Sequence, residues 1–215
     1  EDGSMIRFIY GDQLNAFPKL KRTMHEDRTW QFKERLGWDV TGDEAGWERD
    51  EYDAMNPLYV IWENADGTHG GSMRFLPTTE QTMVNDHFSN LLNGVVIRSP
   101  FIWECTRFVL GQGANSRVAA AMMLAGGELM RAFSLTHLLG VFDPRMVRIY
   151  STIGASPEVL GSPGEGRDKI SVGLWPFRPE DRLQVLQRAG LSSGISEHLF
   201  SRSFGHPIHA LQKAA

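Results

Sequence analysis

Apolar residues along the chain follow two different periods. Short runs that are rich in β-branched and aromatic residues are typical of strands, and they fall at residues 5–10, 58–63, 72–77, 99–110, 147–153 and 169–177. Helical periodicity is predicted over residues 12–34, with a break near Pro18, and over 82–92, 116–139 and 179–190. The pattern predicts a mixed, mostly antiparallel sheet flanked by helices, an α+β (or α/β) three-layer sandwich.

Turn and cap residues refine these elements. An Asp-Gly turn signal at 66–67 joins the runs at 58–63 and 72–77, and it predicts an antiparallel hairpin. Asn115 or Ser116 is expected to cap the long helix, because short polar side chains accept hydrogen bonds from the first helical amides.

Two segments are expected to be loops. Residues 41–56 are acidic, rich in turn formers and without apolar periodicity. Residues 154–166 contain Pro157, Pro163 and four glycines, which disfavour a helix.

Charged residues interrupt two of the predicted strands. Glu104 and Arg107 lie among large apolar side chains, and Arg74 lies in the run at 72–77. A buried charge without a partner is costly, so each of these groups requires one. With a strand period of two, Glu104 and Arg107 point to opposite faces, and they can meet only through a β-bulge.

These charges have two explanations when Arg28, Asp50 and Asp53 are added to them. The first is a structural ion network that ties the acidic loop to the sheet. The second is a polar cleft that binds a zwitterionic ligand. Because ion networks are common, the residues alone leave both explanations open.

Composition limits the classes of protein. The 215 residues are 41% hydrophobic, which suits one domain over residues 5–205. Residues 1–4 have the look of a cloning remnant, and residues 206–215, with their two histidines, are expected to form a flexible tail rather than a metal site.

A net charge of −4 and the lack of a long apolar run favour a cytoplasmic protein that binds neither nucleic acid nor membrane. The one cysteine, Cys105, is expected to be buried and inert.

Four segments resemble the acyl-homoserine-lactone synthases of the LuxI type, the autoinducer synthases. They are RTWQFKERLGWDV, ERDEYD, GSMRFLPTT and FIWECTRFVL, in matching order over residues 28–110. The motif positions of that family fall on Arg28, Phe32, Trp38, Asp50, Asp53, Arg74, Glu104 and Arg107.

The resemblance implies a fold similar to GCN5-type acetyltransferases, with a V-shaped opening between central strands. It also implies two substrates, S-adenosylmethionine (SAM) and a fatty acyl thioester carried on acyl carrier protein or coenzyme A. The products would be an acyl-homoserine lactone, which is a quorum-sensing signal, methylthioadenosine and a free thiol. No tightly bound cofactor and no metal are expected.

Chemistry assigns provisional roles to the charged residues. The SAM amine must lose a proton before it attacks, so Glu104 is a candidate base, although it could instead only orient Arg107 or Arg28. Arg28 or Arg107 is expected to hold the methionine carboxylate, and Asp50 or Asp53 to hold the amine or the sulfonium.

Further residues are candidates for binding substrate. Phe32 and Trp38 offer aromatic surface to adenine or sulfonium, or else form a hydrophobic lid. The backbone amide of Phe108 is a candidate oxyanion donor. Hydroxyl groups that could read the acyl group, and methionines that could line its pocket or simply belong to the core, are Thr106, Ser151, Thr152, Met122, Met123 and Met146.

Two rival functions remain open. One is a GCN5-like acyl-CoA N-acyltransferase that acts on another amine. Enzymes of that kind cradle the pyrophosphate of coenzyme A in a glycine loop whose spacing is not matched by GQGANSR at residues 111–117. The other is a signal-binding or scaffold protein without catalysis.

Overall fold

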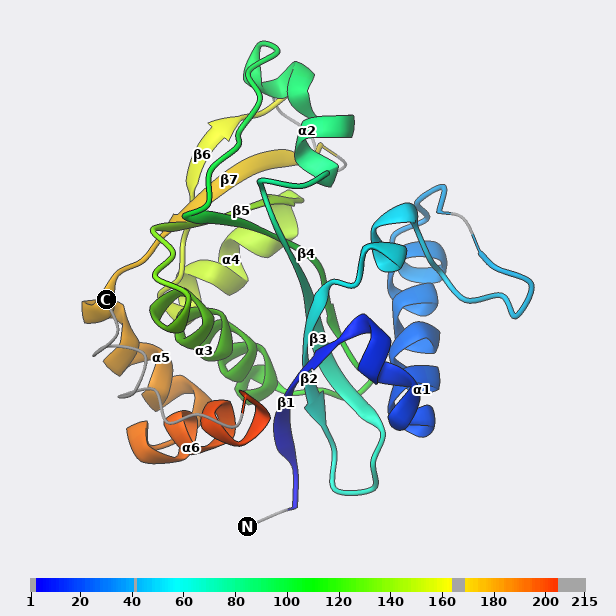
Figure 1. Ribbon diagram of the computed structural model, residues 1–215, viewed down its shortest axis with the longest axis vertical. Coiled ribbons are helices and arrows are strands. Elements are labelled where there is room, and N and C mark those ends of the chain that lie inside the picture. Colours follow the sequence, from blue (N-terminus) through cyan, green and yellow to red (C-terminus); the bar gives the residue numbers. More distant parts are fainter. Residues whose placement is uncertain (1–2, 41, 164–168, 205–215) are drawn as a thin grey trace.

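The computed structural model describes residues 3–40, 42–163 and 169–204. It contains a seven-stranded sheet with the strand order β1-β2-β3-β4-β5-β7-β6 (Figure 1). The strands are β1 (Met5–Tyr10), β2 (Leu58–Glu63), β3 (His69–Pro77), β4 (Ile102–Leu110), β5 (His137–Phe142), β6 (Glu158–Gly161) and β7 (Ser171–Pro176). Only the β4–β5 pair is parallel among these, so the expected mixed, mostly antiparallel sheet is confirmed.

Helices cover both faces of the sheet (Figure 1). The α-helices are α1 (Pro18–Thr29), α2 (Met83–His87), α3 (Ser116–Ala132), α4 (Pro144–Ile153), α5 (Arg182–Ala189) and α6 (Ser193–Phe204). Shorter or wider helical turns are η1 (Gly11–Ala16), η2 (Trp30–Arg35), η3 (Glu51–Met55), η4 (Ser89–Leu92) and η5 (Pro179–Asp181). The positions 206–215 that were expected to form a tail lie outside the described residues.

Alternating residues of β2 build two cores. Leu58 and Val60 pack with α3, α5 and α6, whereas Tyr59 and Ile61 pack with α1. This alternation is what a strand covered on both faces requires. The predicted hairpin is confirmed by the antiparallel β2–β3 pair, and Asn115 caps α3 by accepting from the amides of Arg117 and Val118.

The prediction of a strand over 147–153 was wrong, because these residues belong to α4. Asp143 caps this helix by accepting from the Arg145 amide, Pro144 occupies its first turn, and Gly154 ends it in the left-handed conformation. The cap and the proline therefore outweigh the strand preference of the β-branched residues that follow.

Three other elements differ from the prediction. The helix predicted over 116–139 ends at Ala132. Ser134 follows in the left-handed conformation with φ +54°, and residues 137–139 belong to β5. The segment predicted as loop at 154–166 contains the edge strand β6. The helix α6 was not predicted, although its Phe200 is buried against Phe8.

A β-bulge and a strand separation shape the middle of the sheet. Arg74 pairs with Thr106 and Ser72 pairs with Val109, so β4 carries one residue more than β3 between these pairs. Arg107 lies in the bulge with φ +53°. The bulge on which contact between Glu104 and Arg107 depended is therefore confirmed.

The strands β4 and β5 pair only over Ile102–Glu104 and His137–Leu139, and then they diverge. The V-shaped opening that the resemblance implied is present at this point.

None of the helices within residues 3–40, 42–163 and 169–204 has the length and apolar character needed to cross a bilayer.

Gly140 lies where β5 leaves β4, and it generates a test of the close strand approach. A Cβ at this position would lie 2.7 Å from the Cys105 carbonyl oxygen. We expect Gly140→Ala to lower the free energy of unfolding by about 1–3 kcal/mol, because backbone must shift to admit the methyl group. Denaturant unfolding measures the loss.

The matched control is Gly127→Ala in α3. A Cβ there meets no atom within 4 Å, and alanine favours a helix over glycine by about 1 kcal/mol. Gly127→Ala should therefore keep or raise stability, and a Gly140→Ala protein as stable as the wild type would contradict the proposed close approach.

Candidate active site

Three arginines and three carboxylates form one buried ion cluster. Arg28 donates to Glu48 at 2.7 Å and to both oxygens of Asp53 at 2.9 Å. Arg74 contacts Asp50 and Asp53, and Arg107 contacts Glu48 and Asp50 at 2.8 Å. Each carboxylate thus bridges two arginines. We refer to these six residues, Arg28, Glu48, Asp50, Asp53, Arg74 and Arg107, as the ion cluster.

Four separate segments supply the ion cluster. Arg28 comes from the end of α1, Arg74 from β3 and Arg107 from the bulge of β4. The acids come from the segment at 48–53, where the Asp50 side chain caps η3 by accepting from the amides of Tyr52 and Asp53. The cap fixes the carboxylates relative to the backbone, so the acidic loop is held to the sheet at defined positions.

Burial and charge pairing decide the protonation of the cluster. Arg28 and Arg74 are each 1% exposed. Burial alone would raise the pKa of Asp53, but the guanidinium groups of Arg28 and Arg74 and the Tyr59 hydroxyl outweigh it and hold that pKa well below its usual range. Asp53 therefore stays ionised between these two arginines.

Glu104 lies apart from the ion cluster. Its two oxygens accept from the backbone amides of Met83 at 3.0 Å and Val84 at 2.6 Å, in the first turn of α2. Burial raises the pKa of Glu104 to about 7, against the opposing effect of these two amides and of the Arg74 charge. The alternative in which Glu104 orients Arg107 or Arg28 finds no support, because Glu104 holds α2 instead.

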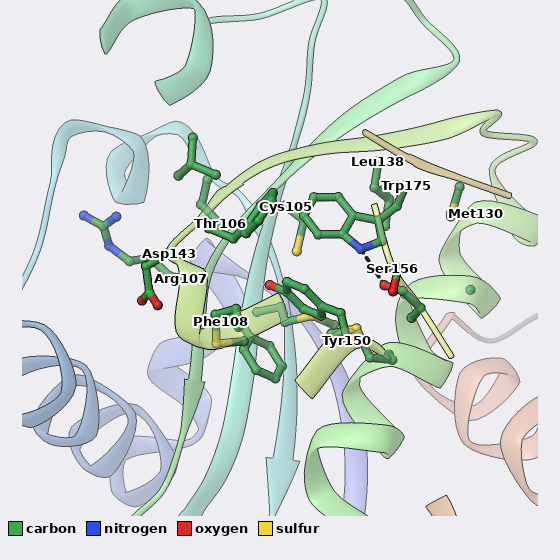
Figure 2. A pocket seen from close by; sticks show the side chains of 18 of the residues that line it. Cys105, Thr106, Arg107, Phe108, Met130, Leu138, Asp143, Tyr150, Ser156 and Trp175 are labelled. Carbon is green, nitrogen blue, oxygen red and sulfur yellow. Dashed lines mark hydrogen bonds between the residues drawn. The ribbon is translucent and has the colours of Figure 1, made fainter. Parts of the chain in front are cut away.

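A cavity of about 780 Å³ runs between the diverging strands (Figure 2). Its lining comes from η2 and the following loop, from α2 and β4, and from α3, α4, β7 and α5. These elements lie on both faces of the sheet, so the cavity passes through the opening between β4 and β5. At one end the Phe32 and Trp38 rings stack with centroids 5.2 Å apart, and the Arg107 guanidinium lies 5.1 Å from the Phe32 centroid.

Apart from Glu104, the residues predicted from sequence separate into three groups. Those that line the cavity are Phe32, Trp38, Thr106, Arg107, Phe108, Met123 and Met146. Arg28, Asp50, Asp53 and Arg74 lie behind the wall in the ion cluster, where Arg74 also donates to the Thr106 hydroxyl at 3.0 Å.

The third group does not reach the cavity. Met122 is fully buried in the core of α3, so the expectation that it lines the acyl pocket was wrong. Ser151 and Thr152 lie on the exposed side of α4, and Thr152 bonds back to the Arg148 carbonyl. Their expected position on a strand beside the acyl group does not hold.

Several lining or cluster residues escaped the sequence reasoning. Glu48 joins Arg28 to Arg107, but it stood in a loop with many acids and no periodicity. Tyr150 and Trp175 line the cavity, and their ring centroids lie 5.3 Å apart. Tyr150 was hidden by the wrong strand assignment, whereas the cap at Asp143-Pro144 was a readable helix signal.

Cys105 also lines the cavity and is only half-buried by its surface exposure. Burial of the sulfur and the Glu104 charge raise the pKa of the thiol to about 12, so it stays protonated. The described part of the chain contains no group of three or more His, Cys, Asp or Glu side chains placed to hold a metal ion.

The chain is similar to known proteins in sequence and fold. The sequence profile of the autoinducer synthases matches residues 13–185. The chain is similar to an acyl-homoserine-lactone synthase of Rhizobium etli, with 36% identity over 195 residues that cover 87% of this chain and 91% of that protein.

Two solved structures share the fold. The first is BjaI, described as a CoA-dependent acyl-homoserine lactone synthase with SAM and isopentyl-CoA, at a TM-score of 0.77 and 20% identity over 89% of this chain and 92% of that one. The second is MesI, also described as CoA-dependent, at a TM-score of 0.75 and 24% identity over 88% of this chain and 97% of that one.

Arg74 generates a test of the ion cluster. Arg74→Ala leaves Asp50 and Asp53 each short of one partner, and we expect a loss of about 3–5 kcal/mol in the free energy of unfolding. Urea unfolding and the yield of soluble protein measure it. The control is Arg22→Ala, whose half-exposed pair with Glu26 is worth less than about 1 kcal/mol. A stable but inactive Arg74→Ala protein would contradict a structural role.

Proposed function

This chain belongs to the autoinducer synthase family and is an acyl-homoserine-lactone synthase, an acyltransferase, and we propose that it joins SAM to an acyl thioester inside the cavity between β4 and β5. The SAM amine is acylated first. The methionine part then closes into a lactone and methylthioadenosine leaves. The product is an acyl-homoserine lactone, a quorum-sensing signal.

The observation that carries this proposal is the cavity that crosses the sheet. Its end near η2 offers aromatic rings and the Arg107 guanidinium, whereas its opposite part is lined by apolar side chains of α3, α4 and β5. A zwitterion and an acyl chain can therefore occupy the two parts at once. The β4 bulge lies between them, where the two substrates would meet.

SAM occupies the end near η2 in this proposal. Phe32 and Trp38 provide stacked aromatic surface for adenine or for the sulfonium charge. Arg107 lines the cavity and holds the methionine carboxylate. Asp50 and Glu48 contact Arg107 from behind the wall and fix its position, and Arg28 and Asp53 hold these acids within the ion cluster.

Amide formation passes through a tetrahedral oxyanion on the thioester carbon. The bulge takes Arg107 and Phe108 out of the regular pairing with β3, and backbone amides released from a ladder are suitable oxyanion donors. Phe108 also lines the cavity. We therefore assign the thioester carbonyl to the bulge.

Glu104 is the proposed base for the SAM amine. Its pKa is raised to about 7, which is close to the pKa of about 7.7–8.0 of a free α-amino group. Glu104 is 1% exposed and does not line the described cavity. The proton therefore reaches it through a water molecule, or after the first turn of α2 moves away from its oxygens.

Lactonisation requires folding of the substrate more than acid or base. The methionine carboxylate attacks its own γ-carbon, and the sulfonium leaves as a neutral thioether. Holding the carboxylate and the adenosine in fixed positions favours this ring closure. Arg107 and the aromatic pair of Phe32 and Trp38 are the residues placed to do so.

The acyl donor is a thioester of coenzyme A or of acyl carrier protein. One assay tests both the donor and the reaction. Purified protein is incubated with SAM and octanoyl thioester on either carrier, and lactone and methylthioadenosine are followed by mass spectrometry. We expect both products in equal amounts. Consumption of thioester with another amine and without lactone would instead indicate a general N-acyltransferase.

The base role predicts a pH-dependent loss in Glu104→Gln. Only ionised Glu104 accepts a proton, so the wild-type rate should fall as the pH drops below about 7. Glu104→Gln should lower the rate roughly 100-fold or more at pH 8, and its residual rate should follow the titration of the SAM amine at about 7.7–8.0 instead of a limb near 7. Methylthioadenosine release against pH is the measurement.

Glu63→Gln, on β2 and paired with Arg7, is the control and should keep the wild-type profile. Thermal melting of Glu104→Gln separates catalysis from the anchoring of α2. A near-normal rate, with the pH limb retained, would remove Glu104 from the base role.

A second variant tests the link between the ion cluster and SAM. Asp50→Asn removes a charge that contacts Arg74 and Arg107. We expect SAM affinity to fall roughly tenfold, which corresponds to the loss of one charge-assisted contact, while acyl-donor affinity changes less. Calorimetry with each substrate alone measures both, and unchanged SAM affinity would reduce Asp50 to a structural anchor.

A further inference from the structure

Thr82 presents a buried hydroxyl that has no hydrogen-bond partner among the described residues. The whole residue is shielded from solvent. Buried hydroxyl groups normally have a partner, because burial removes the water that would otherwise accept from them or donate to them. An unsatisfied hydroxyl at this place therefore requires a physical reason.

Thr82 occupies the position from which a threonine normally caps a helix. It precedes α2 with extended backbone angles, φ −140° and ψ 150°, as a capping residue requires. Its hydroxyl nevertheless accepts from none of the described amides. The Val84 amide, which a threonine at this position ordinarily reaches, donates to Glu104 at 2.6 Å, and the Met83 amide donates to the same carboxylate at 3.0 Å. A side chain of β4 thus takes the place of the local cap.

The ionisation of Glu104 decides which of the two side chains holds α2. An ionised carboxylate makes hydrogen bonds roughly twice as strong as those of a neutral group, so ionised Glu104 displaces the Thr82 hydroxyl. Protonation removes this advantage, because one carboxyl oxygen then carries the proton and becomes a donor. The first turn of α2 loses part of its support at that moment, unless another acceptor replaces the carboxylate.

The charged or titratable groups that act on Glu104 from neighbouring elements are Arg74, Asp50, Tyr52 and Cys105. The Arg74 charge lowers the pKa of Glu104 and the Asp50 charge raises it, and these two groups pair with each other in the ion cluster. Burial raises the pKa of Tyr52 and of Cys105, so both stay neutral. Proton uptake in this region therefore falls on Glu104.

We propose that Thr82 is a second cap for α2, and that its hydroxyl takes over the Val84 amide when Glu104 receives the proton of the SAM amine. The inference rests on the proposed function for the source of that proton. The exchange needs only a rotation of the Thr82 side chain, since its backbone already has the capping conformation. Thr82 is thus a positioning residue, which keeps Met83 and Phe88 of α2 in the cavity wall while Glu104 is protonated.

A thermal-melting cycle at pH 8 tests the exchange without any turnover. The four proteins are the wild type, Thr82→Val, Glu104→Gln and the double variant. Thr82→Val alone should melt at or slightly above the wild-type temperature, because ionised Glu104 holds α2 and the lost hydroxyl had no partner. In the Glu104→Gln protein, whose neutral amide imitates the protonated acid, Thr82→Val should lower the melting temperature by roughly 2–4 °C.

The pH dependence of lactone formation is a second test, and it needs no change at Glu104. If the Thr82 hydroxyl supports the protonated state, Thr82→Val should lower the pKa of Glu104 and move the acid limb of the rate down by roughly half a pH unit. A hydroxyl that only makes the surroundings polar would act in the opposite direction, since its loss favours the neutral acid. Asp86 and His87, the titratable residues of α2 itself, are the same in every protein compared.

Two variants serve as controls. Thr82→Ser keeps a capping hydroxyl, so it should retain the wild-type acid limb and the wild-type melting behaviour in both backgrounds. Thr79→Val makes the same chemical change at an exposed position in the turn between β3 and α2. It should leave the acid limb and the melting temperatures unchanged.

Two results would overturn the proposal. Equal effects of Thr82→Val on melting in the two backgrounds would show that the hydroxyl does not respond to the state of Glu104. An acid limb that stays in place or moves up in Thr82→Val would show the same for the working enzyme. Failure of the wild type to make lactone from any donor would count against the proposed function instead, because the melting cycle still decides whether the caps exchange.

Discussion

The pairing of Arg28, Arg74 and Arg107 with Glu48, Asp50 and Asp53 is the interaction on which the site depends. It joins α1, the acidic loop, β3 and the β4 bulge, which are separate in the sequence. Each carboxylate contacts two arginines, so removing one arginine leaves two buried carboxylates each short of one partner. The stability of this region and the position of Arg107 in the cavity therefore depend on the same contacts.

The second constraint is the backbone of β4. The bulge turns Arg107 toward the ion cluster, while the separation from β5 beyond Glu104 opens the sheet. Gly140 permits the close approach at the point where the strands divide. The charged groups and the apolar part of the cavity consequently meet along a few residues of one strand.

Sequence reasoning reached the parts of the molecule that local rules determine. Unpaired charges in apolar runs required partners, and strand periodicity required a bulge, so Arg74, Arg107 and the two aspartates could be anticipated. Partner choice was less accessible. Glu48 was one of several acids in an aperiodic loop, and Glu104 bonds to the amides of α2, which carry no side-chain signal. The residues of α4 favour a strand by type, and the Asp143 cap with its proline decides for a helix.

The division of labour within the cavity has an evolutionary consequence. The groups proposed for chemistry sit on α1, the acidic loop and β4, whereas Met123, Met130 and Met146 lie on α3 and α4, across the opening. Methionine side chains tolerate exchange for other apolar residues with modest loss of stability. Substitutions at these methionines can therefore change the acyl group of the signal molecule during evolution. They do so without disturbing the charged residues of the ion cluster.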